Sequence, residues 1–183
     1  SANGSPRPAE RHERGVLKVS AVTGGVYRPE ENKVVEENEL TDRELVVPVR
    51  GDLLLSRANT RDLVAAVCLV GDAPANVFLP DKLWRVRPAS GRVRNEYLRY
   101  LLSHPRVHDL IASTASGTSG SMLNVSQEKV RSMRLPLPPK DLQDRFARVV
   151  WDADAMRRRQ LEGVETSEAL FAAIQHRAFR GEL

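Results

Sequence analysis

The sequence predicts an α+β fold: a globular domain of short strands and helices in residues 1–139, then one long coiled-coil-like helix in residues 140–183. Short apolar segments closed by turn residues recur through the first half of the chain. Three prolines in residues 134–139 exclude a helix or central strand there and indicate a hinge. After this break, apolar residues follow a helical spacing. The 183 residues, 41% of them hydrophobic, suffice for a domain with a core and an accessory element.

The expected strands are short and separated by turns. Gly24-Gly25 ends the first strand, the turn Arg50-Gly51-Asp52 precedes the second, and residues 56–60 turn after it. Residues 26–33 are expected to be a polar excursion, and Thr41 can begin a short helix. The predicted strands cover residues 15–23, 53–55, 63–70, 77–79 and 82–86.

A loop rich in serine and glycine is predicted in residues 113–126 (STASGTSGSMLNVS). Such a segment cannot pack as a core element, but its hydroxyl groups can donate hydrogen bonds. Residues 97–112 before it have helical spacing, and Ser126 after it can cap a helix that includes Lys129. A polar loop held between two ordered elements favours a functional role. The alternative is a plain flexible linker.

The predicted C-terminal helix is long for a small domain. About 37 residues of helix span roughly 55 Å, so we expect it to reach another element. Gly163 can bend this helix. The alternative to reaching another element is that the helix folds back on its own domain. The apolar seam, interrupted by Gln160 and Ser167, consists of Leu142, Phe146, Val149, Ala153, Met156, Val164, Leu170, Ile174 and Ala178.

Charge is unevenly distributed along the chain. The net charge is +4, but residues 81–134 carry 10 basic against 4 acidic residues and include the loop. A basic segment of this kind favours a phosphate-backbone ligand, although a solvated basic face would look the same. Cys68 lies in an apolar run, residues 1–15 are polar, and no apolar run approaches the roughly 20 residues of a membrane span. We therefore expect a cytoplasmic protein without a membrane partner.

Motifs in a fixed order resemble the target-recognition domain of type I restriction-modification specificity subunits. The residues that carry the resemblance are 51–60 (GDLLLSRANT), 79–88 (LPDKLWRVRP), 115–126 (ASGTSGSMLNVS), 135–139 (LPLPP) followed by Gln143, and 170–183 (LFAAIQHRAFRGEL). The complete subunits of that family have two recognition domains and two long helices, whereas this sequence has one of each. The resemblance, together with a sequence that starts without Met, therefore predicts a half subunit or a fragment.

The resemblance implies a non-catalytic subunit that binds double-stranded DNA and reads one half of a split target. In that family the methyltransferase (M) subunit holds S-adenosylmethionine and the restriction (R) subunit holds the nuclease. The residues agree, since the sequence has no GxxxxGK[ST] loop, no CxxC pair and no HExxH motif. Asp52 lacks an ExK-like partner and is expected to form a turn. We expect no catalytic residue, no metal site and no cofactor.

Candidate DNA contacts follow from side-chain chemistry. Arg57 suits guanine and Asn59 suits adenine, although Asn59 also fits a turn. Trp84 is expected in the core, and further candidates for groove contact are residues 23–25 and 7–14. Phosphate contacts are predicted for Lys82, Arg85, Thr118, Ser119, Ser121 and Lys129.

The long helix also leads to a prediction about assembly. A single helix with an apolar seam can pair with the same helix of a second copy, which predicts a homodimer through residues 141–178. The competing hypothesis is a non-catalytic adaptor that assembles a complex through this helix and whose basic face is incidental.

Overall fold

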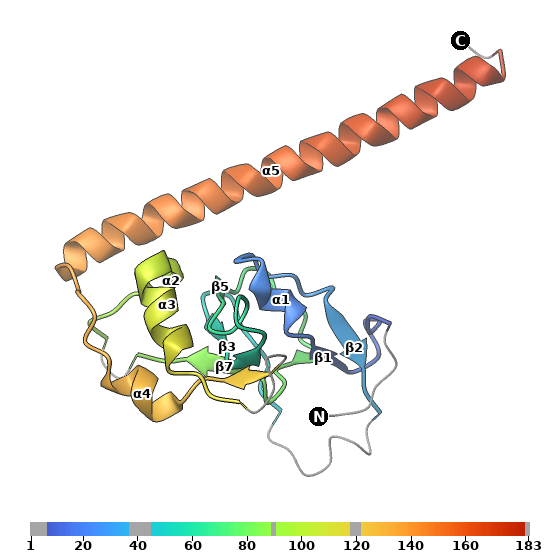
Figure 1. Ribbon diagram of the computed structural model, residues 1–183. Coiled ribbons are helices and arrows are strands. Elements are labelled where there is room, and N and C mark those ends of the chain that lie inside the picture. The colour runs from blue at the N-terminus through green and yellow to red at the C-terminus, as the bar shows by residue number, and fades with distance from the viewer. Residues whose placement is uncertain (1–6, 37–44, 89–90, 118–121, 182–183) are drawn as a thin grey trace. The chain divides into compact units, whose positions relative to one another are not determined.

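The computed structural model describes residues 7–36, 45–88, 91–117 and 122–181 (Figure 1). It divides into two compact units, residues 1–143 and residues 144–183. The first unit holds every strand and short helix, and the second is the greater part of one long helix. The α+β fold class predicted from the sequence is confirmed.

Three small sheets form the frame of the first unit. β1 (Gly15–Leu17) pairs antiparallel with β2 (Asn32–Val34) and parallel with β6 (Val77–Phe78). The second sheet has the order β5-β3-β7, and the third joins β4 to β8. All pairs in the last two sheets are antiparallel. Their strands are β3 (Leu53–Ser56), β5 (Val67–Leu69), β7 (Leu83–Val86), β4 (Ala58–Asn59) and β8 (Leu123–Asn124).

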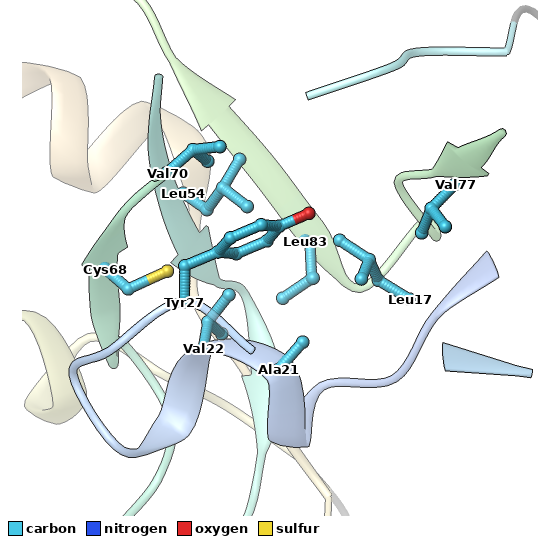
Figure 2. Packing of buried hydrophobic residues seen from close by; sticks show 9 residues of the cluster. All are labelled: Leu17, Ala21, Val22, Tyr27, Leu54, Cys68, Val70, Val77 and Leu83. Carbon is cyan, nitrogen blue, oxygen red and sulfur yellow. The ribbon is translucent and has the colours of Figure 1, made fainter. Parts of the chain in front are cut away.

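The two faces of the β5-β3-β7 sheet carry separate cores, because successive side chains of a strand point to opposite faces. Leu54 and Cys68 belong to the first core, which also takes side chains from α1 (Ser20–Thr23). Figure 2 shows the ring of Tyr27 among the other eight residues of this core. Leu53 and Leu55 belong to the second core, which helices α2 (Asn95–Ser103) and α3 (Pro105–Ser113) cover.

The strand predicted for residues 15–23 ends early. The structure has a strand only to Leu17, after which α1 begins, and Ala21 and Val22 are fully buried in the first core. Burying both side chains in this core stabilises the helical turn more than their alternating pattern favours a strand. The polar excursion at residues 26–33 was also wrong in part, because it contains the start of β2. Asn32 is 3% exposed there, and its Oδ1 accepts a hydrogen bond from the backbone N–H of Ala9.

The predicted strand at residues 63–70 is shorter, and the predicted turn at residues 56–60 contains a strand. Only Val67–Leu69 is extended as β5, because residues 60–65 form a turn in which Ala65 has a φ of 65°. Ala58–Asn59, expected in a turn, instead pairs with Leu123–Asn124. This pairing joins segments far apart in the sequence, and no local pattern indicates it. The predicted helix start at Thr41 lies outside the described residues.

The single helix predicted for residues 97–112 is two helices, α2 (Asn95–Ser103) and α3 (Pro105–Ser113). The break falls at His104, which has an extended backbone with φ −62° and ψ 129°. A residue before proline avoids the helical region, and proline is favoured at the first position of a helix. The cap at Ser126 is confirmed: its side chain accepts from the backbone N–H of Lys129 at the start of α4 (Gln127–Ser132).

The long helix is present as α5 (Lys140–Phe179), 40 residues without a break (Figure 1). Gly163 lies within it, so the possible bend does not interrupt the helix. In the second unit, seam residues such as Val149, Met156 and Leu170 are 64%, 66% and 61% exposed. No helix in the described part of the chain is long and apolar enough to cross a membrane.

Candidate nucleic-acid interface

The base of the Ser/Gly loop is fixed by backbone hydrogen bonds. Ser116 and Asn124 exchange bonds of 3.0 and 2.9 Å, and β8 pairs with β4 directly beside them. A Cβ on Gly117 would clash with the carbonyl oxygen of Met122, so the chain needs glycine where it leaves this pair. Both ends of the loop are therefore held in one place. Thr118, Ser119 and Ser121, which were predicted to contact phosphates, lie outside the described residues.

Arg57 links this loop base to the central sheet. Its backbone N–H donates to Lys82 O at 2.9 Å, and its carbonyl accepts from Val125 N at 2.8 Å. Its guanidinium Cζ lies 5.8 Å from the centroid of the Trp84 ring. Arg57 thus stands between the start of β7 and the segment that leads from the loop into α4.

Asn59 ends β4 opposite Leu123. Its Oδ1 accepts from the backbone N–H of Thr60 at 2.8 Å, the local bond that a turn residue makes. This bond fits the turn role that the sequence also allows for Asn59. The side chain is half-buried, not fully buried. Contact with a base remains a prediction.

Lys82 and Lys129 flank the same region. Lys82 is half-buried and accepts the Arg57 bond through its backbone, whereas Lys129 is exposed in the first turn of α4. Neither lysine side chain has a described hydrogen bond or ion pair. The structure therefore brings Lys82, Arg57, Asn59 and the start of α4 together at one edge, which we call the loop edge.

Arg85 lies apart from the loop edge. It pairs across the sheet with Leu54, and its Nη1 lies 3.4 Å from Asp52 Oδ2 and donates to Val47 O at 3.3 Å. The two charged side chains are only 20% and 15% exposed. Asp52 also accepts from the backbone N–H of Val49 at 2.9 Å, as a turn residue would. Contact of Arg85 with a phosphate stays a prediction.

The two further candidate segments have internal partners. Arg7 donates to Glu13 at 2.6 Å, and this bond, followed by the backbone N–H of Glu10, lowers the pKa of Glu13 to about 2. At Gly25, where φ is 70°, the carbonyl accepts from Arg99 Nη2 at 2.7 Å. The first contact is local, whereas the second joins residues 74 positions apart. Among the described residues, no group of three or more His, Cys, Asp or Glu side chains could hold a metal ion.

Gln143 has a structural role that its place after the proline motif did not indicate. Its side chain is 1% exposed, and its Oε1 accepts from Arg94 N at 2.9 Å. Its Nε2 donates to Arg92 O at 3.1 Å and to Pro138 O at 2.9 Å. One amide thus ties the proline-rich segment to the loop before α2. A glutamine that follows the proline run was the available signal, but two of its partners, Arg92 and Arg94, lie 51 and 49 positions away.

Comparison with known proteins finds homologous relatives. No family model matches the chain. The chain is 32% identical over 140 residues to the type I restriction enzyme EcoEI specificity subunit of Escherichia coli. The chain is homologous to type I restriction enzyme specificity subunits. The match covers 76% of this chain and 23% of the relative's length, so it concerns less than a quarter of that protein.

The fold supports the same relationship. The crystal structure of the HsdS subunit from Thermoanaerobacter tengcongensis resembles this specificity-subunit homologue with a TM-score of 0.50 and 19% identity. The similarity covers 88% of this chain and 39% of that chain. That similarity concerns the fold. The resemblance noted from the sequence motifs is confirmed by the homologous relative.

Proposed function

We propose that this chain acts as a sequence-specific, double-stranded DNA-binding specificity subunit of a type I restriction-modification complex. It reads one half of a bipartite target and directs the M and R subunits to it. It is a cytoplasmic, non-catalytic component and uses no cofactor of its own. The loop edge supports this proposal most, since it groups cationic and amide side chains on a domain homologous to specificity subunits.

In this proposal the side chains of the loop edge have two tasks. Lys82 and Lys129, with the hydroxyl groups of Thr118, Ser119 and Ser121, contact phosphates and set the register on the duplex. Arg57 and Asn59 contact base edges in the major groove, where each base pair has its own donor and acceptor pattern. Affinity then depends on salt, and sequence preference depends on Arg57 and Asn59.

A selection from a random pool of duplexes tests this function. The purified chain should enrich a short sequence at low salt, and its affinity should fall by about 0.9 log units per log unit of salt for each phosphate contacted. A scrambled duplex of equal length is the control for non-specific binding. Absence of any enrichment, with no binding even in low salt, would contradict the proposal.

Pairing through α5 is the second part of the proposal. The exposed seam residues Val149, Met156 and Leu170 would be covered by the same helix of a second copy, giving a homodimer through residues 141–178 that reads a palindromic, interrupted site. Sedimentation at tens of micromolar should show a dimer that Val149→Glu separates. Glu165→Gln on the same helix is a control outside the seam. A wild-type monomer would refute the pairing.

The exposed seam also favours a second candidate, the adaptor. In that case α5 assembles other proteins and the first unit does not bind DNA. The duplex selection separates the two functions, because an adaptor would show no enrichment while its helix still formed a complex.

A further inference from the structure

Trp84 lies beside the guanidinium of Arg57 at the end of the central sheet. The separation of 5.8 Å from Arg57 Cζ to the ring centroid is within the range of about 6 Å for a cation–π contact. The indole is itself held in place, since Trp84 pairs with Leu55 across the sheet and packs against the second core. A fixed ring therefore lies next to a charged side chain of the loop edge.

The environment of Arg57 leaves one edge of its guanidinium open. Nε is buried and has no hydrogen-bond partner among the described residues. The two terminal nitrogens, Nη1 and Nη2, are not among the buried unpaired atoms and make no described hydrogen bond. Only the terminal edge can then meet a ligand from solvent. Two parallel donors on that edge match the O6 and N7 acceptors of guanine.

We propose that Trp84 is a positioning residue for guanine readout: its ring fixes the plane of the Arg57 guanidinium and directs the terminal edge toward the DNA. This inference rests on the proposed DNA-recognition function. A long arginine side chain loses rotamer freedom when it binds, and a guanidinium already held over a fixed ring by a cation–π contact loses less. The contact with Trp84 thus favours the bidentate contact over looser contacts with other bases.

The first test needs no DNA. In the wild-type chain, ring currents of Trp84 should shift the NMR signals of the Arg57 Hδ and Nε–H protons, assigned by their loss in Arg57→Lys. In Trp84→Leu these signals should return to the positions of an unstacked arginine. Identical signals in wild type and Trp84→Leu would overturn the proposal, because the stack would be absent in solution.

The second test uses the duplex enriched from the random pool, with each guanine replaced in turn by 7-deazaguanine, which lacks the N7 acceptor. For the wild-type chain, one replacement should lower affinity about tenfold. That loss should disappear in Arg57→Ala and fall below about threefold in Trp84→Leu. In Trp84→Phe it should lie between the wild-type loss and the Trp84→Leu loss. Affinity for scrambled DNA and the salt slope should stay unchanged in both Trp84 variants.

The controls separate positioning from folding. Trp151→Leu makes the same substitution in α5 and should keep the full tenfold loss. If Trp84→Leu fails to fold, Trp84→Phe decides, since it keeps an aromatic face of weaker potential. A full tenfold loss in a folded Trp84→Leu or an undiminished loss in Trp84→Phe would overturn the proposal. If the wild-type chain enriches no duplex, the proposed function fails, whereas failure of the stack alone leaves enrichment intact.

Discussion

Replacing Gln143 by leucine should destabilise the first unit strongly. The side chain is 1% exposed, and its removal leaves the N–H of Arg94 and the carbonyls of Arg92 and Pro138 without this partner. These three bonds are part-buried, and a hydrogen bond contributes about 0.5–1.5 kcal/mol net to stability. At about 1 kcal/mol for each bond, their loss lowers the free energy of unfolding by about 3 kcal/mol.

Urea unfolding followed by Trp84 fluorescence in a Trp151→Phe background would measure this loss. Gln175→Leu, an exposed position on α5 outside the seam, is the matched control and should change stability by less than about 0.5 kcal/mol. A loss below about 1 kcal/mol in Gln143→Leu would refute the reasoning, because the amide would then not satisfy the three backbone groups.

Gln143→Glu adds a pH test of the same contacts. The carbonyls of Arg92 and Pro138 would face a carboxylate, which raises the pKa of the introduced carboxyl above its value in the unfolded chain. The protonated form is then favoured by folding. Relative to wild type, the variant should be most stable at low pH and should lose stability as pH rises through the raised pKa.

The remaining predictions concern binding and the first core. Lys82→Ala and Lys129→Ala should each weaken binding to all duplexes and reduce the salt slope by about one, whereas an unchanged slope would exclude that lysine from the interface. Tyr27→Phe should leave stability unchanged or raise it by about 1 kcal/mol in urea unfolding, because the buried hydroxyl has no described partner; a clear loss would contradict this. Burial raises the pKa of the Cys68 thiol to about 12, so its alkylation at pH 8 should follow unfolding; rapid labelling of the folded chain would refute that.

Local patterns in the sequence predicted the elements whose formation depends on neighbouring residues. The proline run, the Ser126 cap and the helical spacing after residue 139 each act within a few residues, and the structure has the corresponding elements. The spacing also predicted helix in residues 97–112, but it did not reveal the break that Pro105 imposes. Pro105 marks the break in the sequence, but the apolar spacing of residues 97–112 favoured one continuous helix.

Elements fixed by distant partners could not be predicted in this way. β4 exists because β8, more than sixty residues later, supplies its hydrogen bonds. Arg85 was expected at the interface on charge alone, yet it lies in an ion pair with Asp52 across the sheet. Charge in a sequence shows which side chains are cationic, but it does not reveal an ion pair formed across strands.

The separate segments of the loop edge are joined to one another by backbone bonds. Arg57 N and O, the Ser116–Asn124 pair and the β4–β8 ladder all use main-chain groups, which residues other than proline supply. Side chains at positions 57 and 59 can therefore change without removing the bonds that fix the edge, whereas Gly117 cannot gain a Cβ without a clash. A frame of this kind separates folding from recognition. For a specificity subunit, it would allow the preferred DNA sequence to change while the domain keeps its fold.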